Sequence, residues 1–482
     1  MINKRAQFFI LTGTILLSFL MHFHVFTVDL VGYHVWRQTQ TQNNIESFYK
    51  EDFNILHPKT NDRGNGSGIQ RLEFPVMQWL FACFYKLFGD HLIISRILSF
   101  IIGIFSMIGI YFLLKNIFHN SVIGLIGAWT FTFSPVFYYY TMNPLPDNFA
   151  LCCSIWGLAF FFQWISQKIF LQLFISGCLL SLGILAKLPF ILFLSVPVIY
   201  FFLETKSNRK YYLRFLFLFL LLIPPFIWYA KAIAPHWSPV VYGIFDEHNL
   251  SMIRILDILQ FNLISTLPEL LINYGSVFFF LYGFYYIYKK EVYKNIRFKI
   301  FLAFAVVLLL YFLYEMHIIA KIHDYYLFPF LPLIFITVSY GCFHLLNSQK
   351  KLLVRFGFFL LLILPVTAYV RADTRWDIQD PGFNSDLLVY KNELRNAVPD
   401  TALCIVGNDE SKNIFLYYVN KRGWAFENND LDSIKIKTMI DKGAEYLYCD
   451  SREVDEKKEI KSFLDSLIIQ KGTVKIYTLK KK

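Results

Sequence analysis

The chain has 482 residues, of which 56% are hydrophobic and 19% aromatic, and its mean hydropathy is +0.45. Soluble globular chains are less apolar, so this composition excludes an ordinary soluble enzyme and predicts a polytopic α-helical membrane protein. The formal net charge of +11 is explained by basic loops at the cytoplasmic face of a membrane, so nucleic-acid binding is not expected.

The first apolar segment, 6–28, is longer than the core of a signal peptide and lacks a small-residue cleavage site, so we expect a signal anchor. Runs of about 17–25 apolar residues can each cross a bilayer as a helix. About 11 such runs are expected as transmembrane helices. They lie at 6–28, 91–114, 121–140, 148–166, 169–187, 188–203, 213–232, 266–288, 298–314, 325–346 and 352–370.

Basic clusters in the loops predict the orientation, because Lys and Arg favour the cytoplasmic side. They lie at 206–214, 289–299 and 350–351. All of them face the cytoplasm if the short apolar segment 75–88 lies on the membrane and does not cross it. If it crossed, these loops would face outward, so we reject that arrangement. The sequence therefore predicts a multi-pass protein of the cytoplasmic (inner) membrane with its N-terminus inside.

The C-terminal region, 372–482, is more charged than the rest of the chain. Its apolar runs 402–406 and 446–449 are strand-like, with helical patterns between them, which is typical of a small α/β domain. By parity of the spans it lies outside the membrane. The remaining part, 1–371, is expected to form the transmembrane domain, with 29–90 as an extracytoplasmic loop that contains juxtamembrane helices.

The cysteines show no CxxC or Cys/His spacing typical of a metal site. Cys404 and Cys449 lie in the polar C-terminal region, where they form either a disulfide or two buried strand cysteines. The others lie in apolar segments, where we expect them to pack as small hydrophobic residues. These are Cys83, Cys152, Cys153, Cys178 and Cys342.

Ionisable residues gather in the polar segments predicted to face outward. The first segment contains Asp29, His34, Arg37 and Glu73, and the second contains Asp147. Charges this close to a bilayer are costly to desolvate and often mark a functional site. A channel would place such groups along a pore, so their position at one face favours a reaction between a membrane-held substrate and a group presented from outside.

Further candidates lie in the later outward segments: Lys187, His248, Lys321 and His323. Arg and Lys bind phosphate, a carboxylate or imidazole can deprotonate a hydroxyl, and Glu with His can hold a divalent cation. Together these groups fit displacement at a sugar anomeric carbon with a lipid phosphate as leaving group. The residue types alone also allow phosphoethanolamine transfer or lipid transport.

Each candidate also has an ordinary structural alternative. Arg37 and Lys187 suit interfacial anchors whose charged ends reach water. Glu73 and Asp147 each lie beside a proline that opens a helix, where an acid can cap the first turn. His34 also suits a satisfied surface histidine.

The segment His34-Val35-Trp36-Arg37-Gln38 resembles the first extracytoplasmic loop of GT-C glycosyltransferases of family 39. That family includes the protein O-mannosyltransferases and the lipid A aminoarabinose transferases. Its loop has an acidic residue followed closely by Arg and an aromatic, so His34 stands at the acid position. A group of bacterial members carries this His-x-Trp-Arg-Gln form. Asp29, five residues earlier, is the alternative for the role of the acid.

Other segments resemble the family in the same order along 1–370. Leu72-Glu73-Phe74-Pro75 resembles its Glu-x-Pro-Pro segment, with Phe74 where a lysine is often found, so a phosphate contact is missing or supplied elsewhere. The further matches are Arg96, Pro144-Leu145-Pro146-Asp147, Leu185-Ala186-Lys187-Leu188-Pro189, Trp228-Tyr229, Glu247-His248 and His323-Asp324-Tyr325-Tyr326-Leu327-Phe328-Pro329.

The resemblance implies an inverting glycosyltransferase that moves a sugar from a polyprenyl-phosphate donor to a hydroxyl of a lipid, glycan or protein acceptor outside the cytoplasm. The alternative is a transporter or flippase of polyprenyl-linked sugars, although no repeat typical of transporters is evident. The implied catalytic residues are His34, Asp29, Arg37, Glu73 and Asp147. The implied ligands of the donor phosphate are Arg37, Lys187, Lys321 and His323. Glu73 and His248 are the candidates to hold a divalent cation.

Overall fold

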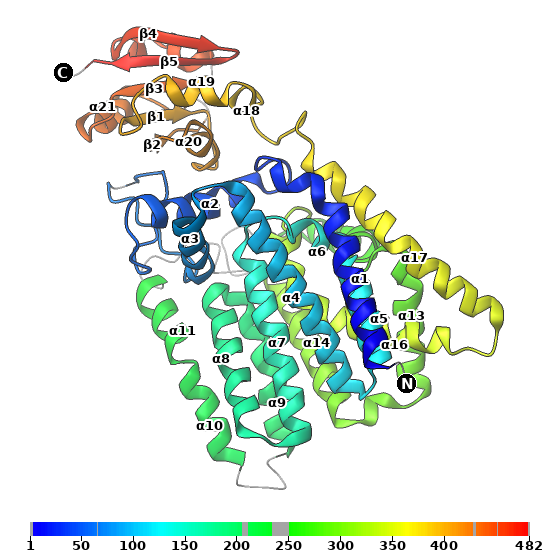
Figure 1. Cartoon of the computed structure of the whole chain (residues 1–482). Helices are drawn as coiled ribbons and strands as arrows, with labels where there is room; N and C mark the ends of the chain where they lie inside the picture. The colour runs from blue at the N-terminus through cyan, green and yellow to red at the C-terminus, as the bar shows by residue number, and fades with distance from the viewer. Residues whose placement is uncertain are drawn as a thin grey trace. The chain divides into compact units, whose positions relative to one another are not determined.

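The computed structural model describes residues 3–64, 66–204, 211–233, 250–427, 430–450 and 452–480. Its contacts divide the chain into two compact units (Figure 1). Unit 1 comprises Met1–Thr27, Leu72–Phe74 and Ser95–Thr374, and unit 2 comprises Val28–Arg71, Pro75–Ile94 and Arg375–Lys482. These are units of contact, so the domain division expected at 1–371 and 372–482 stays a prediction.

Unit 1 is a bundle of apolar helices. Its α-helices are α1 (Lys4–His22), α4 (Leu92–Phe118, of which the first three residues belong to unit 2), α5 (Ser121–Thr132), α6 (Pro135–Tyr140), α7 (Pro146–Gln167), α8 (Phe170–Ala186), α9 (Ser195–Glu204), α10 (Tyr211–Leu221), α11 (Ile223–Ile227), α12 (Met252–Phe261), α13 (Tyr274–Lys289), α14 (Ile296–Tyr314), α15 (Met316–Ile319), α16 (Leu331–Leu346) and α17 (Lys351–Asp373). The 3-10 and π turns that join them are η1 (Phe23–Thr27), η2 (Leu188–Leu194), η3 (Trp228–Ile233), η7 (Asn262–Leu271), η8 (Val292–Lys294) and η9 (Asp324–Phe330), and η10 (Thr374–Trp376) follows α17.

Six helices of the described chain are long and apolar enough to cross a membrane, and a bent pair would make a seventh. The six are Lys4–Thr27, Leu92–Phe118, Pro146–Gln167, Ile296–Tyr314, Asp324–Leu346 and Lys351–Trp376, and the pair is Met252–Leu271 with Tyr274–Lys289. Shorter apolar helices lie in four further segments. The predicted class of polytopic helical membrane protein is confirmed, whereas the count of about 11 spans stays a prediction.

The helices of unit 1 begin and pack for local reasons. The side chains of Asn3, Asn120 and Asn295 each accept a hydrogen bond from a backbone N–H in the first turn of α1, α5 and α14. Helices α13 and α16 approach closely through glycines: a Cβ on Gly283 would lie 2.2 Å from the carbonyl oxygen of Thr337. Small residues allow such close packing between helices in a membrane.

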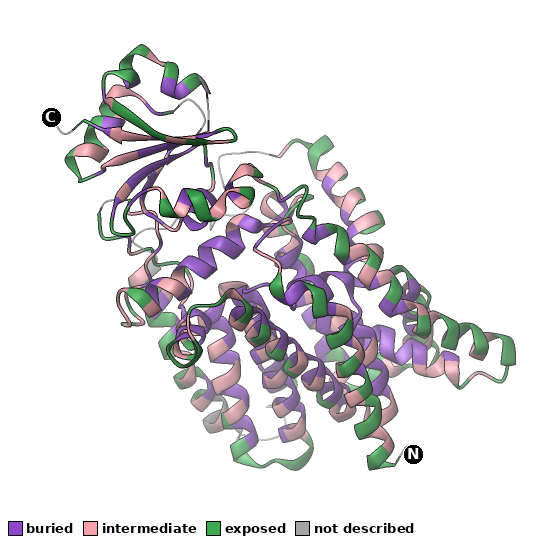
Figure 2. Cartoon of the chain, turned by 45° about the horizontal axis from the view of Figure 1, so that its top comes forward, coloured by how far each residue is buried: buried purple, intermediate pink, exposed green. Residues whose placement is uncertain are grey.

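Unit 2 begins with two helices, α2 (Val35–Lys50) and α3 (Val76–Phe88). Helix α2 is rich in polar residues, yet most of them are buried (Figure 2). Gln42 of α2 donates a hydrogen bond to the hydroxyl of Tyr85 in α3, over 2.7 Å. The 13 residues of α3 span only about 20 Å, which is too short to cross a hydrocarbon core of about 30 Å. Its exposed side is apolar, and includes Leu80, Phe84, Leu87 and Phe88.

The C-terminal part of unit 2 is the expected small α/β domain. Its five strands have the order β2-β1-β3-β5-β4, in which β1 is parallel to β2 and β3, and β5 is antiparallel to β3 and β4. The strands are β1 (Leu403–Gly407), β2 (Arg422–Ala425), β3 (Tyr446–Cys449), β4 (Leu464–Lys471) and β5 (Val474–Leu479). The helices are α18 (Asp386–Val389), α19 (Lys391–Asn396), α20 (Ile414–Val419), α21 (Ser433–Asp441), α22 (Arg452–Glu456) and α23 (Lys458–Lys461).

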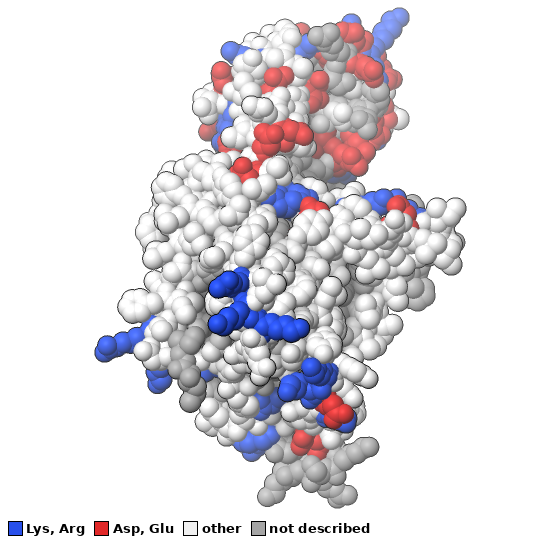
Figure 3. Space-filling view, turned by 90° about the vertical axis from the view of Figure 1, so that its right-hand side faces the viewer, with Lys and Arg blue, Asp and Glu red and all other residues white. Residues whose placement is uncertain are grey.

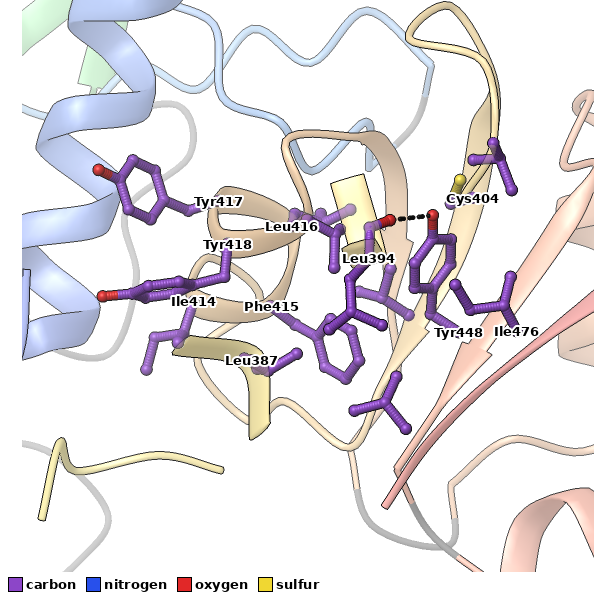
Figure 4. Packing of buried hydrophobic residues seen from close by; sticks show 14 of the residues in the cluster. Leu387, Leu394, Cys404, Ile414, Phe415, Leu416, Tyr417, Tyr418, Tyr448 and Ile476 are labelled. Atoms are coloured by element: carbon purple, nitrogen blue, oxygen red, sulfur yellow. Dashed lines mark hydrogen bonds between the residues drawn. The ribbon is translucent and has the colours of Figure 1, made fainter. Parts of the chain in front are cut away.

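Alternating strand residues form two cores, one on each face of this sheet. Figure 4 shows one of them, in which the hydroxyl of Tyr448 donates to the carbonyl of Leu394 over 2.9 Å. Leu30 and Val35, from the polar segment after α1, belong to the same core. Cys404 and Cys449 are free and buried in the neighbouring strands β1 and β3. Of the two predicted possibilities, the structure therefore shows two buried strand cysteines and no disulfide between them.

Candidate functional site

Glu73 is held in unit 1 by its two neighbours. The backbone N–H of Phe74 donates to the carbonyl of Leu185 at the end of α8, over 2.9 Å. The indole N–H of Trp228 donates to the carbonyl of Leu72, over 3.1 Å, and its ring lies 4.9 Å from that of Phe74. These contacts fix Glu73 beside the end of α8. Phe74 therefore packs on an aromatic residue at the place where the family often has a lysine.

Asp147 and Lys187 form an ion pair in the same region. Pro146 opens α7, so Asp147 lies in its first turn, where a negative charge is stabilised by the helix dipole. Lys187 follows the last residue of α8, and its Nζ atom lies 3.7 Å from Oδ2 of Asp147. Only 3% of the Asp147 side chain and 12% of the Lys187 side chain are exposed. The low exposure reduces screening of their attraction by water.

Tyr229 connects Glu73 to this ion pair. Its hydroxyl group is a hydrogen-bond donor positioned between two acceptors, the carbonyl oxygens of Ile184 and Leu185, at 3.1 and 3.2 Å. The same phenol interacts electrostatically with both Glu73 and Asp147. The structure therefore brings together three residues that the sequence predicted separately.

Glu315 is a fourth charged residue of this group. It follows the last residue of α14, and burial raises the pKa of its carboxyl group to about 7, while Lys187 opposes that shift. Tyr311, in the last turn of α14, interacts electrostatically with both Asp147 and Glu315. We refer to Glu73, Asp147, Lys187 and Glu315 as the polar cluster.

His323 lies at the edge of the polar cluster. Its Nδ1 atom is 2.7 Å from the carbonyl oxygen of Ile318, and a carbonyl can only accept, so Nδ1 carries the proton and Nε2 is the basic nitrogen. Burial lowers the pKa of His323, and Lys187 acts in the same direction. Both side chains approach the rings of Tyr325 and Tyr326: the imidazole centroid is 5.8 and 6.0 Å away, and Nζ of Lys187 is 5.8 and 5.7 Å away.

The segment that starts at His323 is tied to the bundle by a buried carboxylate. The hydroxyl of Tyr140 donates to Oδ1 of Asp324 over 2.6 Å, and both residues are buried. Arg96, also buried, donates to the carbonyl of Met142 over 3.0 Å. Lys321 is differently placed, because its Nζ atom pairs with Asp257 of α12 at 2.8 Å and its side chain is 36% exposed.

Three predicted site residues lie in unit 2 and not with the polar cluster of unit 1. His34 is buried, precedes α2, and has a left-handed backbone with φ of 57°, an uncommon conformation for a residue other than glycine. Arg37 is buried and donates to the side-chain oxygen of Gln40. Asp29 pairs with Lys391 of α19 at 2.6 Å.

The remaining sequence predictions concern a metal. His248 lies outside the described residues, so its pairing with Glu73 stays a prediction. Across the part of the chain that the structure describes, no group of three or more His, Cys, Asp or Glu side chains is arranged to hold a metal ion.

Sequence reasoning did not select Glu315, Tyr325 or Tyr326 for the site. Glu315 belongs to the last segment predicted to face outward, and Tyr325 and Tyr326 begin the predicted span that follows it, so their location was a signal. Their residue types did not indicate a functional site, because glutamate and tyrosine are common at membrane surfaces.

Residues 73–229 match a family model described as dolichyl-phosphate-mannose-protein mannosyltransferase. No curated protein sequence matches the chain significantly. The family model thus covers the segment that contains Glu73, Asp147, Lys187 and Tyr229.

Solved structures match more than nine-tenths of the chain. ArnT from Cupriavidus metallidurans in the apo state has a TM-score of 0.67 at 10% identity, over 97% of this chain and 98% of that one. The same protein bound to undecaprenyl phosphate has a TM-score of 0.65 at 10% identity, over 98% and 97%. The Archaeoglobus fulgidus oligosaccharyltransferase in complex with Zn and sulfate has a TM-score of 0.60 at 13% identity, over 92% and 68%. These likenesses confirm the predicted GT-C membrane fold.

Proposed function

We propose that this chain, a GT-C-fold glycosyltransferase related to family 39, transfers a sugar from a polyprenyl-phosphate donor to a hydroxyl group of a lipid, glycan or protein. The observation that carries the proposal is the position of the polar cluster. It combines an ammonium group with three carboxyl groups, of which Asp147 and Glu315 lie at the ends of α7 and α14 and Glu73 precedes α3. It also lies next to a short segment whose side chains line an apolar cavity.

The apolar cavity lies within unit 1 and has a volume of about 620 Å³. Side chains from η7, α13, α14, η9 and α16 line it, among them Leu267, Phe284, Leu309, Leu327 and Phe330. Because η9 begins at Asp324, the residue after His323, one short segment reaches from the polar cluster to the cavity wall. A donor with a charged head and a hydrocarbon tail matches these two surroundings.

The reaction is a single displacement at the anomeric carbon. A base removes the proton of the acceptor hydroxyl, whose oxygen forms a bond to that carbon. The bond from the carbon to the phosphate oxygen breaks, and polyprenyl phosphate leaves with the electron pair. Lys187 and His323 are the proposed phosphate ligands in unit 1. The ammonium group of Lys187 stabilises the charge that develops on the leaving group, and His323 can donate to the phosphate once its Nε2 atom takes up a proton.

The carboxylates have separate proposed roles. Asp147 orients Lys187 through their ion pair, and Glu73 is proposed to act on the donor side. Carboxylate oxygens are ligands of hard divalent cations, so Glu73 and Asp147 suit a cation that would neutralise the leaving phosphate. Lys187 already supplies a positive charge at that place, so the described residues fit such a cation only in part. The oligosaccharyltransferase of the same fold was solved in complex with Zn and sulfate, which is consistent with a bound cation.

His34 or Asp29 is the proposed base that removes the proton of the acceptor hydroxyl. Arg37 is a further proposed ligand of the donor phosphate. Lys321 is the weakest of the proposed ligands, since it is exposed and paired with Asp257.

We infer the orientation from the basic loops. The loops between α13 and α14 and between α16 and α17 lie at the end of unit 1 that also carries the N-terminus (Figure 1). On the face of unit 1 drawn in Figure 3, Lys and Arg form separate patches on a surface with few charges. The positive-inside rule then places this end in the cytoplasm and the polar segments on the other side of the cytoplasmic membrane.

Release of free polyprenyl phosphate tests the function. The full chain, purified into nanodiscs, is incubated with radiolabelled polyprenyl-phosphate sugars and a mixture of envelope lipids, glycans and peptides. We expect labelled acceptor and free polyprenyl phosphate in equal amounts. Movement of intact donor across liposomes without its cleavage would overturn the proposal in favour of a flippase.

A further inference from the structure

The polar segment after α1 extends the C-terminal sheet within unit 2. Asp62 forms a parallel bridge with Gly423 of the edge strand β2. The N–H of Arg63 donates to the carbonyl of Gly423 over 2.7 Å, and the N–H of Gly423 donates to the carbonyl of Asn61 over 3.0 Å. The indole N–H of Trp424 adds a bond of 3.0 Å to the carbonyl of Gly64. These bonds fix the glycine-rich turn after Arg63 beside the sheet edge.

A pocket of about 400 Å³ lies at this junction. Its lining combines the turn with the sheet edge and the end of α21. The lining residues are Arg63, Gly66, Thr401, Leu403, Arg422, Trp424 and Lys442. The volume falls within the range of small-ligand sites, roughly 300–1,000 Å³. Three cations and an indole ring therefore face one concave surface, and no acid belongs to the lining.

A single carboxylate organises two of the cations. Both oxygens of Glu51 accept from Nη2 of Arg63 at 3.1 Å, and Oε1 forms an ion pair with Nε of Arg422 at 3.0 Å. Only 12% of the Glu51 side chain is exposed. The two guanidinium groups are thus held in place while one negative charge offsets only one of them. With Lys442 added, the pocket keeps a charge of about +2.

Donors remain available in the pocket. The described contacts of Arg422 use its Nε atom, so its two terminal amino groups can donate to a bound anion. Lys442 is exposed and has no ion pair among the residues that the structure describes. A planar guanidinium beside a mobile ammonium is a typical arrangement for binding phosphate or carboxylate. The ring of Trp424, fixed by its bond to Gly64, supplies an apolar wall.

We propose that this basic pocket binds an anionic saccharide through its phosphate or carboxylate group. This inference rests on the proposed function, since it makes the pocket a site for part of the acceptor. It also limits the acceptor class, because a neutral acceptor would leave the net positive charge of the pocket unbalanced.

Direct binding tests the proposal on the full chain in nanodiscs of zwitterionic lipid. The probes are glucose 1-phosphate, glucuronate and neutral methyl glucoside, with affinity measured by calorimetry at low and high salt. The variants are Lys442→Glu and Arg422→Gln. The matched control is Lys437→Glu, which changes an exposed lysine of α21, the helix that Lys442 follows; Lys437 does not line the pocket. The phosphate and carboxylate probes show which anion the pocket prefers.

We expect the charged probes to bind more tightly than methyl glucoside, with affinity falling as salt rises. Lys442→Glu should weaken their binding about tenfold, because a charge-assisted contact is lost and a negative charge gained. Lys437→Glu should bind as the wild type does. Equal affinity for charged and neutral probes, or equal effects of Lys442→Glu and Lys437→Glu, would overturn the proposal.

Donor cleavage on the same preparations separates the two proposals. Probe binding without cleavage of any polyprenyl-phosphate sugar contradicts the proposed function and the acceptor role of the pocket. Cleavage without binding of the charged probes contradicts the pocket alone. Dependence on Lys442 for binding anionic-lipid nanodiscs, with no affinity for the saccharides, would assign the pocket to a membrane surface and overturn the proposal.

Discussion

The ammonium group of Lys187 lies 3.7 Å from the buried carboxylate of Asp147, at the place where α7 begins and α8 ends. Removing water from one charge alone is costly, so each residue is stable in this place because of the other. Glu315 and His323 both interact electrostatically with the same ammonium group. Lys187 is therefore the positive centre of the polar cluster.

Replacing Lys187 by Met should reduce sugar transfer about 10- to 100-fold, the loss expected for a charge-assisted contact to the leaving phosphate. The measurement is the initial rate with a polyprenyl-phosphate sugar at equal amounts of folded protein. Lys168→Met is the matched control, because Lys168 ends α7 and its amino group binds the hydroxyl of Tyr200, not the polar cluster. Similar rates in both variants would remove Lys187 from the site.

The stability of unit 1 should depend on pH through Glu315. Its folded pKa is raised to about 7, above the usual value of 4.5. Between these pH values the folded state keeps a proton that the unfolded state has released, so stability is lost as pH rises through this window. Glu315→Gln removes that loss. The melting temperature of the variant should therefore rise relative to the wild type from pH 4.5 to 7 and stay higher above it.

Differential scanning fluorimetry in detergent across pH 4 to 8 measures this effect. Glu291→Gln is the control, because the Glu291 side chain is 59% exposed in the loop before α14. A constant difference in melting temperature between Glu315→Gln and the wild type at every pH would contradict the assignment of the titration to Glu315.

The sequence predicted the membrane class and the α/β domain because both depend on patterns within a short window. Apolar runs as long as a bilayer is thick predict membrane helices such as α4, and short apolar runs within a charged region predict β1 and β3. The same reasoning selected Glu73, Asp147 and Lys187, since charges are rare next to apolar runs.

The grouping of these residues was not predictable from one sequence. Glu73 lies beside the end of α8 because its neighbours Leu72 and Phe74 are bonded to Trp228 and Leu185. Such contacts depend on side-chain shape across a large separation in the sequence. Likewise, no local pattern showed that Asp29 would pair with a lysine of the C-terminal domain.

The pairing of Asp29 with Lys391 gives a test of whether Asp29 is the catalytic base. If the carboxylate only holds α19 in place, Asp29→Asn and Lys391→Met break the same contact and should lower the melting temperature and the transfer rate to a similar, small extent. If Asp29 removes the acceptor proton, Asp29→Asn should lower the rate about 100-fold or more while Lys391→Met leaves most of it. We expect the first outcome, because the oxygen that faces Lys391 is already engaged at 2.6 Å.

Replacing His34 tests the other candidate base, and its backbone determines which variants are suitable. With φ of 57°, alanine at this position would strain the chain before α2, whereas glycine and asparagine adopt this conformation readily. His34→Gly and His34→Asn should therefore keep the melting temperature within a few degrees of the wild type. If the imidazole is the base, both should lose about 100- to 10,000-fold in transfer rate. His34→Ala serves as the strain control and should be less stable than either. Wild-type rates in the glycine and asparagine variants would assign His34 a structural role. If Asp29→Asn is active as well, the base lies outside the first polar segment.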